Sequence, residues 1–307
     1  MNPRIVVMGS VNMDLVVRSP RIPMPGETIL GESLSEYPGG KGANQAVGAA
    51  RAGGLVAMVG CVGDDTFGRS LRASLNQAGV DTSRLVVRGP RSGVALIEVA
   101  ASGENSIVVV PGANGLLTHA DAKAALAACP QAEILLLQLE IPMEAVEGAA
   151  AAARERGVRV LLDPAPAGPL SDRLLATVDI LTPNQPEAAL LTGMAAVGVA
   201  DAPEAARRLL ARGVGMVLVK LGAEGVLLAT AEGMDHLPGH GVATVDTTAA
   251  GDCMAGALAA ALVAGRSPRD AVAFANAAAA LSTTRQGAQN SMPVLEEIER
   301  FLAATHG

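Results

Sequence analysis

The sequence predicts an α/β protein of three layers, α/β/α, in which helices cover both faces of a mostly parallel sheet and a small β-sheet lies beside it. Three observations predict this class. Short apolar runs recur along the chain, stretches with helical spacing separate most of them, and two β-rich segments interrupt the alternation. Residues 1–307 are expected to form a single domain, because no internal repeat or linker is evident.

The first apolar run, Ile5–Met8, ends in Gly9-Ser10 and is typical of a buried parallel strand followed by a turn. Similar runs predict strands at Leu55–Val59, Ile134–Leu139, Val158–Leu162, Ile180–Leu181 and Met216–Val219. Helical spacing falls between them at Gly42–Ala52, Phe67–Ala78, Asp121–Ala128, Met143–Arg156 and Pro203–Arg212. This order gives βαβ units, and the chain after Thr247 is predicted to be almost wholly helical.

Two segments, at approximately 15–38 and 92–111, break this rhythm with short β-like pieces. In the second, two β-rich arms are joined by Ser102-Gly103-Glu104-Asn105, which predicts a hairpin. The two segments can pair into a small sheet over one edge of the main domain. Small sheets of this kind often serve as lids.

Composition and charge exclude several classes of function. The net charge of −7 gives no electrostatic footprint for nucleic acid or an anionic membrane, and the lack of Trp argues against a base-stacking surface. The longest apolar stretch, Cys253–Gly265, is too short to span a bilayer, and the N-terminus does not read as a secretory signal. Three widely spaced cysteines show no metal-binding spacing and fit a reducing cytoplasm.

The strongest motif is Asp246–Asp252, which precedes a long apolar helix. The small residues Ala249, Ala250 and Gly251 leave the backbone N–H groups of the helix start open, and these groups form an anion site. Asp252 in the first turn can then accept a proton from an attacking hydroxyl. An ordinary capping Asp at a helix start is the structural alternative.

A second motif, Pro38–Asn44, places glycines before a helix that begins with Lys41. Glycine allows close approach to a ligand, and only three of the 23 basic residues are lysines, two of them in glycine-flanked motifs. No Ser or Thr follows Lys41 in the frame of a Walker P-loop. A plain glycine turn before a helix remains the alternative.

Three weaker motifs follow predicted strands. Asn12-Met13-Asp14 offers an amide and a carboxylate for sugar hydroxyls, although both types are common in turns. In Thr182–Glu187, the Asn and the Glu one helical turn apart can hold magnesium through its waters, or can form a capping box. The glycines of Lys220–Gly225 can admit a nucleotide, or can form a hairpin into Val226–Ala229.

Together these pieces resemble the ribokinase family of carbohydrate kinases, the phosphofructokinase-B group, over essentially the whole chain. The hallmark segments match Gly39–Asn44 and Asp246–Asp252, and further similarity lies in Pro164–Ala167, Thr182–Glu187 and Thr284–Gln289. The resemblance implies a ribokinase-like fold with a β lid. It also implies ATP-dependent phosphorylation of the terminal hydroxyl of a sugar, with D-ribose favoured, and a homodimer that pairs through the lid.

The resemblance also implies site roles. Asp252 is the catalytic base, and Gly251, Ala250 and Ala249 form the anion hole. The sugar pocket comprises Asn12, Asp14, Gly40, Lys41, Asn44, Glu140 and Asp252. The ATP site comprises Asn184, Lys220, Gly222, Gly225, Gly251 and Asn276. Glu187 is the acid linked indirectly to magnesium. The loops that hold a potassium ion comprise Asp246, Thr248, Ser282, Arg285, Gly287 and Ser291.

One departure from the family pattern is Cys253-Met254, where Thr or Ala and then Phe usually stand. A helix N-terminus lowers a thiol pKa, so a redox-sensitive Cys253 is one hypothesis, beside the reading as a small buried hydrophobe. The open alternatives for function are a kinase of the same family for another sugar or a nucleoside, and a non-catalytic regulator that binds sugar or nucleotide. The lid segments contain few basic residues, which argues against a phosphorylated sugar as substrate. A dinucleotide-dependent oxidoreductase is another α/β option, but no Gly-x-Gly-x-x-Gly follows the first strand.

Overall fold

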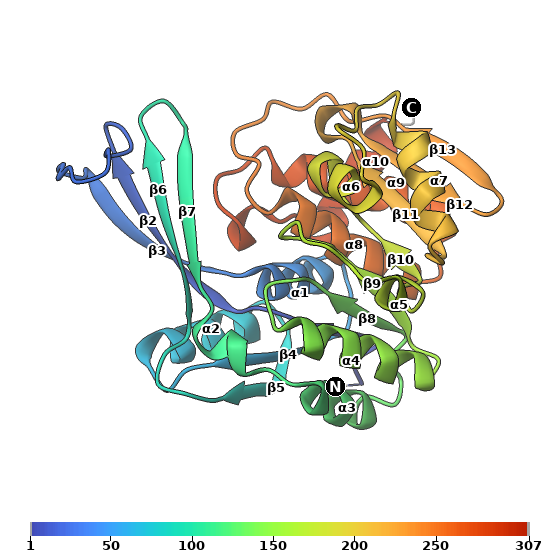
Figure 1. The fold of residues 1–307 in the computed structure, drawn as a ribbon, viewed down its shortest axis with the longest axis horizontal. Coiled ribbons are helices and arrows are strands. Elements are labelled where there is room, and N and C mark those ends of the chain that lie inside the picture. Colours follow the sequence, from blue (N-terminus) through green and yellow to red (C-terminus); the bar gives the residue numbers. More distant parts are fainter. Residues whose placement is uncertain (1, 306–307) are drawn as a thin grey trace.

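The computed structural model describes residues 2–305 and contains, within that range, a nine-stranded main sheet in the order β13-β12-β11-β10-β9-β8-β1-β4-β5 (Figure 1). Its strands from β5 through β11 in this order are parallel, and β12 and β13 extend it as antiparallel strands. The bounds are β1 Ile5–Met8, β4 Val56–Val62, β5 Asp81–Val87, β8 Ile134–Leu137, β9 Arg159–Leu162, β10 Ile180–Leu181, β11 Met216–Lys220, β12 Val226–Thr230 and β13 Gly233–Leu237.

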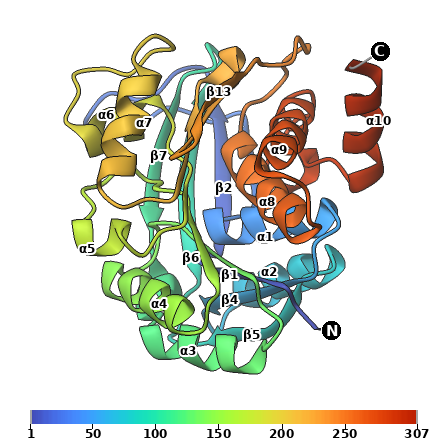
Figure 2. The same ribbon diagram turned by 90° about the vertical axis from the view of Figure 1, so that its right-hand side faces the viewer.

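Helices cover both faces of this sheet (Figure 2). Alternate residues of β1 show why: Ile5 and Val7 pack into one core, whereas Val6 and Met8 pack into the other. The first core is covered by α1 Lys41–Arg51, α2 Thr66–Gln77, α8 Ala250–Val263, α9 Pro268–Ser282 and α10 Leu295–Thr305. The second is covered by α3 His119–Ala128, α4 Met143–Glu155, α5 Asp172–Leu175, α6 Gln185–Thr192 and α7 Ala202–Ala211.

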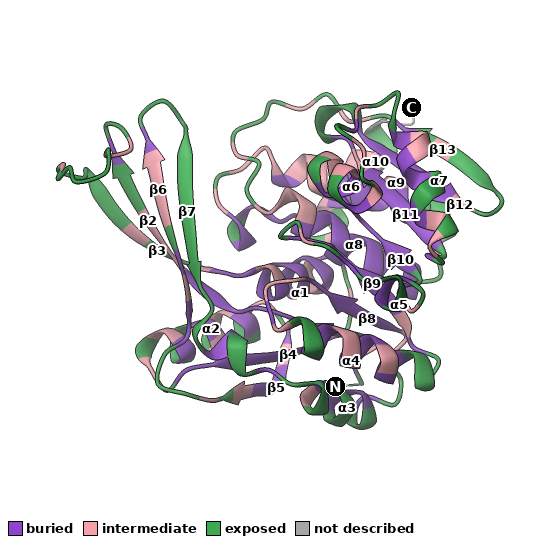
Figure 3. Cartoon of the chain, viewed as in Figure 1, coloured by how far each residue is buried: buried purple, intermediate pink, exposed green. Residues whose placement is uncertain are grey.

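A separate four-stranded sheet, in the order β3-β2-β6-β7, stands beside the main sheet (Figure 1). Its strands are β2 Asn12–Ser19, β3 Ser33–Gly39, β6 Gly93–Ala100 and β7 Asn105–Val110. The two β-rich segments of the sequence therefore pair as predicted. Figure 3 shows that β7 is exposed along its length, in contrast to the buried strands of the main sheet.

The three-layer fold and most predicted elements are confirmed, with boundaries that differ by a few residues. The strand expected at Leu55–Val59, for example, runs from Val56 to Val62. Two strands were missed, β5 and β13. Both lie at the edges of the main sheet and have few buried residues, so neither is apolar throughout. Among the described residues, none of the helices has the length and apolar character needed to cross a membrane.

Helices α1 and α8 pack backbone to backbone, and this contact positions the site. A Cβ added at Gly256 of α8 would lie 2.5 Å from the carbonyl oxygen of Gln45 and 2.6 Å from the backbone nitrogen of Ala49. Only glycine permits so close an approach. One turn before Gly256, the contact sets Asp252 against the first turns of α1.

We therefore expect Gly256→Ala to destabilise the fold by about 1–3 kcal/mol, although Ala is the better helix former. The added methyl group must move backbone atoms, which cannot rotate away as a side chain could. Urea unfolding measures the effect, and Gly168→Ala is the control, since only Pro166 O lies near, at 3.9 Å. Equal stability of the two variants would show that α1 and α8 can separate at little cost.

Candidate active site

The predicted site residues gather where the parallel strands of the main sheet end and face the small sheet. Glu140 follows β8, Asp163 follows β9, and Lys220 is the last residue of β11. A cavity of about 680 Å³ separates the small sheet from the loops before α8 and after α9. Asp14 and Tyr37 line it from the small sheet, and Asp246 lines it from the opposite side.

Asp252 lies in the first turn of α8 and is almost fully buried, at 6 % exposure. Asn44 Nδ2 donates to its Oδ2 at 3.1 Å, and Gln45 Nε2 donates to its Oδ1 at 3.0 Å. Burial raises the pKa of Asp252, and the nearby Lys41 charge opposes that rise. The carboxyl group is thus fixed in orientation and has a pKa shifted toward that of a general base.

The start of α8 offers no side-chain cap. Its N-cap residue, Ala249, adopts a left-handed conformation (φ 58°, ψ 15°) and makes no capping hydrogen bond. Such a conformation is uncommon for a residue other than glycine and is often found at functional sites. A Cβ added at Gly251 would lie 3.4 Å from Lys220 Nζ, so an ammonium group faces the first turn of the helix. Helix N-terminus and cation together suit an anion.

On the side of the small sheet, Lys41 and a group of carboxylates surround Asp252. Burial lowers the pKa of Lys41, but the surrounding carboxylates, led by Asp252 and Asp163, outweigh burial and raise it overall. Burial first, and then the charges of Glu140 and Asp252, raise the pKa of Asp14 to about 7. The structure therefore brings the predicted sugar-binding carboxylates and the lysine into one cluster.

Two predicted sugar-pocket residues are held by hydrogen bonds from segments far away in the chain. Glu140 Oε2 accepts from Ser10 Oγ at 2.5 Å and from the backbone N–H of Lys41 at 3.2 Å. Asn12, which is 2 % exposed, accepts at Oδ1 from Asn114 Nδ2 at 2.7 Å. The amide of Gly40 lies just before α1, with a positive φ of 89° that favours glycine.

A second cavity, of about 530 Å³, lies on the other side of the α8 N-terminus and leads away from the small sheet. Among the predicted ATP-site residues, five line it: Lys220, Gly222, Gly225, Gly251 and Asn276. Asn276 Nδ2 also donates to the carbonyl oxygen of Pro238 at 2.9 Å, which ties α9 to the loop after β13. Gly251, the residue before Asp252, therefore belongs both to the predicted anion site and to the wall of this cavity.

Asn184 does not line this cavity but caps α6 in a capping box with Glu187. Glu187 N donates to Asn184 Oδ1 at 2.9 Å, and Asn184 N donates to Glu187 Oε2 at 2.8 Å. Glu187 is 5 % exposed, and burial raises its pKa. The structural reading of this motif is thus confirmed. The charge of Glu187 still acts on Lys41, so the carboxylate belongs to the same cluster.

The two loops predicted to hold a monovalent cation meet at Asp246. Its carboxylate accepts from the backbone N–H groups of Thr248 and Gly287, each at 2.9 Å. The hydroxyls of Ser282 and Ser291 donate to the carbonyls of Ala279 and Ala288. The guanidinium of Arg285 pairs with Glu297 instead, so only its backbone carbonyl is left as a ligand. Residues 2–305 contain no cluster of three or more His, Cys, Asp or Glu that could hold a metal ion.

Several buried polar residues of the site were missed by sequence reasoning. They are Ser10, Gln45, Asn114, Gln138, Asp163 and Gln289. Asp163 follows a buried strand directly, which is the same signal that indicated Asn12-Met13-Asp14 and could have found it. Gln138 directly follows β8 and carries the same signal. Gln45 lies inside α1 and carries none, because its role depends on contacts with distant segments.

The hypothesis of a reactive Cys253 is not supported. The side chain is 2 % exposed, and burial raises its thiol pKa to about 12, whatever the helix N-terminus contributes. Its Sγ lies 3.5 Å from the carbonyl oxygen of Ala278 on α9. Cys253 is therefore a small hydrophobe in the α8–α9 contact.

Known proteins resemble this chain over nearly its whole length. Residues 2–295 match the model of the pfkB family of carbohydrate kinases. The chain is 42 % identical to the ribokinase of Haemophilus influenzae, covering 98 % of this chain and 99 % of that one, and 36 % identical to the deoxyribokinase of Salmonella typhi, covering 97 % and 98 %. The structure of Arabidopsis thaliana ribokinase complexed with ribose and ATP superposes with a TM-score of 0.92 at 35 % identity, covering 98 % and 99 %.

Proposed function

This chain belongs to the pfkB family of carbohydrate kinases, and from that premise we propose that it transfers the γ-phosphate of ATP to the terminal hydroxyl of D-ribose, giving ribose 5-phosphate. One observation carries the proposal. The buried carboxyl group of Asp252 lies at the start of α8, which has no side-chain cap. The cluster of Asp14, Lys41 and Glu140 lies on one side of it, and the cavity of about 530 Å³ lies on the other. The names of the relatives and of the ribose–ATP complex support ribose as the sugar.

In the proposed mechanism, Asp252 accepts the proton of the attacking hydroxyl, whose oxygen forms a bond to the γ-phosphorus as ADP leaves. The backbone at Ala249, Ala250 and Gly251 stabilises the charge on the transferring group. Asp14, Lys41 and Asn44 orient the sugar, together with Asn12, Gly40 and Glu140. ATP occupies the cavity lined by Lys220, Gly222, Gly225 and Asn276. Asn184 pairs with Lys220 in an isolated β-bridge and so supports the wall of that cavity.

Magnesium, when bound with ATP, neutralises charge on the phosphates. Glu187 fits an indirect role, because its buried carboxylate lies within electrostatic reach of Lys220, Asp163 and Lys41. A potassium site fits the loops around Asp246, whose carboxylate ties Thr248 to Gly287. Carboxylate, hydroxyl and carbonyl oxygens suit a hard cation. These loops border the α8 start, so a cation there would fix the anion hole.

The experiment that tests the function is ADP release with magnesium-ATP and a panel of sugars and nucleosides, each with and without potassium. We expect potassium-dependent turnover on ribose. Turnover on 2-deoxyribose alone would replace the sugar, an alternative favoured by the similarity to a deoxyribokinase. Binding of ribose without any turnover would instead support a non-catalytic regulator.

Ribose affinity is expected to fall below about pH 7. The pKa of Asp14 is about 7, so the free enzyme protonates this carboxyl as the pH falls through neutrality. The protonated group accepts sugar hydroxyls less well, and the KM for ribose then rises. Titration of KM from pH 5.5 to 8.5 measures this, and Asp14→Asn should show a high KM that varies little near pH 7. An unchanged pH profile in that variant would contradict the assignment of Asp14.

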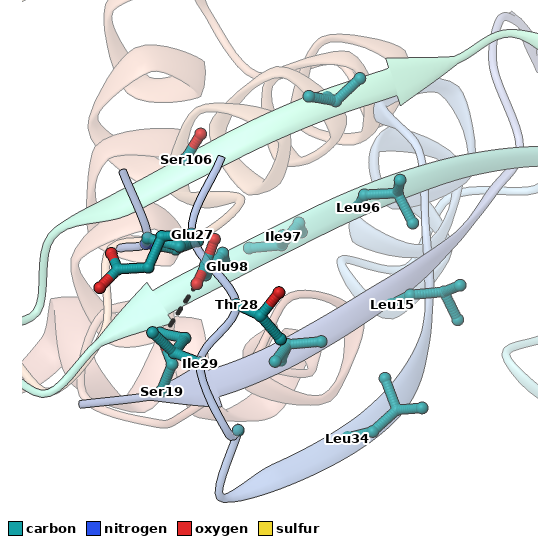
Figure 4. A pocket seen from close by; sticks show the side chains of 14 residues that line it. Leu15, Ser19, Glu27, Thr28, Ile29, Leu34, Leu96, Ile97, Glu98 and Ser106 are labelled. Carbon is teal, nitrogen blue, oxygen red and sulfur yellow. Dashed lines mark hydrogen bonds between the residues drawn. The ribbon is translucent and has the colours of Figure 1, made fainter. Parts of the chain in front are cut away.

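We also propose that the small sheet acts as a lid and pairs two copies of the chain. Its face away from the main sheet is hollowed by a cavity of about 520 Å³, and Figure 4 shows Leu15, Leu34 and Leu96 along it. Leu34 is 64 % exposed and Val108, on the same face, is 57 % exposed. Exposed apolar faces of this kind mark contact surfaces.

With its free, buried cysteines, the chain suits the reducing cytoplasm, which we propose as its location.

Substitution Val108→Glu is expected to give a monomer, because it places a charge in this apolar face. Sedimentation velocity measures the change. Val87→Glu is the matched control, since Val87 is similarly exposed, at 54 %, but lies on β5 of the main sheet and does not line this cavity. A parent protein that sediments as a monomer at micromolar concentration would end the dimer proposal.

A further inference from the structure

A buried polar network runs behind the proposed site and connects its two sides. Lys220 Nζ donates to Asp163 Oδ1 at 2.7 Å, and Thr182 Oγ1 donates to the same oxygen at 3.2 Å. The other oxygen, Asp163 Oδ2, accepts from Gln45 Nε2 at 2.9 Å. Asp163 is 1 % exposed and does not line the ATP cavity, so it acts on the site through the residues that it binds, Lys220 and Gln45.

Gln45 joins this ion pair to Asp252. Its Nε2 amide donates both to Asp163 Oδ2 and to Asp252 Oδ1, at 2.9 and 3.0 Å. Its Oε1 accepts from Gln138 Nε2 at 2.6 Å, which fixes the orientation of the amide. Gln45 and Gln138 are both fully buried, so bulk water cannot take over these hydrogen bonds when one partner is removed.

The far end of the network faces the proposed phosphoryl site. Lys220 lines the ATP cavity, and its Nζ lies 3.4 Å from the position that a Cβ of Gly251 would take. A lysine stem is flexible and carries a strong positive charge, so its ammonium needs a fixed partner to stay over the helix start. Asp163 supplies that partner, with its own position fixed by Thr182 and Gln45.

We propose that Asp163 and Gln45 are positioning residues for phosphoryl transfer: Asp163 holds the Lys220 ammonium over the first turn of α8, and Gln45 holds the base Asp252 at a set separation from that ion pair. The proposal rests on the proposed kinase function. In the step itself, the sugar oxygen forms a bond to the γ-phosphorus and the bond to the oxygen that bridges the β- and γ-phosphorus breaks. Its electron pair leaves with ADP, the hydroxyl proton goes to Asp252, and Lys220 keeps its protons while it balances the charge.

A double-mutant cycle between Asp163 and Lys220 tests the first half of this proposal. We expect Asp163→Asn to lower kcat about 10- to 100-fold, with the KM for ribose changed less than threefold. In a Lys220→Met background, the same substitution should cost nothing further, because the ammonium that Asp163 positions is gone. Additive losses in the double variant would overturn the proposal. Asp121→Asn is the control, since it breaks the ion pair with Arg88 outside the site and should leave turnover unchanged.

The pH dependence of turnover tests the second half, because the two residues act on Asp252 in opposite directions. The charge of Asp163 raises the pKa of Asp252, whereas the hydrogen bond from Gln45 lowers it. The other charged groups facing Asp252 are Lys41 on α1 and Asp14 on β2. The acid limb of the kcat profile should therefore move to lower pH in Asp163→Asn and to higher pH in Gln45→Met. Shifts in the same direction, or none, would show a merely structural role.

Two further measurements keep the outcome decisive. Should Asp163→Asn fail to fold, Thr182→Val removes only the hydroxyl that donates to Asp163 and should lower kcat about 2- to 10-fold. Should the parent enzyme phosphorylate no sugar of the panel, the proposed function fails by itself. The same cycle is then measured in ATP affinity by calorimetry, where non-additive changes support the positioning of Lys220 and additive changes refute it.

Discussion

Replacement of Asp252 by Asn is expected to lower turnover by about 10²–10⁴-fold, the usual contribution of a general base. The amide cannot accept the proton of the sugar hydroxyl. It also places an N–H group against one of two donors, Asn44 Nδ2 or Gln45 Nε2, that now meet carboxylate oxygens. ATP affinity should change only a few-fold, because the backbone of the α8 start is kept.

The measurement is kcat for ribose phosphorylation beside ATP affinity by calorimetry and thermal unfolding of each protein. Asp252→Ala serves as the matched variant, since it removes the base without adding a donor. Both variants should lose turnover to a similar extent while they differ in stability. Near-normal turnover in either variant would remove Asp252 from the mechanism.

Replacement of Lys41 by Met is expected to reduce kcat/KM for ribose by about 10²–10³-fold. Burial raises the pKa of Asp252, and the ammonium charge of Lys41 is the largest influence that lowers it. Without Lys41, several nearby carboxylates lose the positive charge that they share. The nearby carboxylates raise the pKa of Lys41, so the charged lysine stabilises the folded state and a lower unfolding free energy is expected as well. The positive charge of Lys41 lowers the pKa of Asp252, which sets the direction of the pH shift. Without Lys41 the pKa of Asp252 rises, and the acid limb of kcat/KM moves to higher pH.

The chain provides its own control for this prediction. Lys123→Met removes an exposed lysine on α3, on the opposite face of the main sheet, and should change neither kcat/KM nor its pH profile. Lys41→Arg keeps the positive charge but changes the geometry, because the guanidinium is larger and presents its N–H donors in a planar fork. If Lys41→Met keeps the acid limb of the parent enzyme, the electrostatic link between Lys41 and Asp252 is wrong.

Part of the site was predictable because its signals are local. The segments Pro38–Asn44 and Asp246–Asp252 combine small residues with one ionisable group at a helix start, and the structure places both at helix N-termini. Capping chemistry was equally local. Asn184 and Glu187 are three residues apart, and they form the capping box that their spacing allows. The ligand roles of these residues stay predictions.

Other features were missed or misjudged for a common reason. Edge strands β5 and β13 are not apolar throughout, because much of each is exposed. The thiol of Cys253 was open to a redox reading because its position in a helix is local information. Its burial against α9 is not local, and burial raises the pKa.

The sequence by itself determined the alternation of strands and helices, the small second sheet, and the two glycine-rich helix starts, because each depends on residues close together in the chain. Tertiary structure alone decided that Gln45 bridges Asp163 and Asp252, which lie 118 and 207 residues away from it. It also decided that Lys220 faces Gly251. These contacts depend on the order of strands in the sheet and on the close packing of α1 against α8, and no local pattern encodes either.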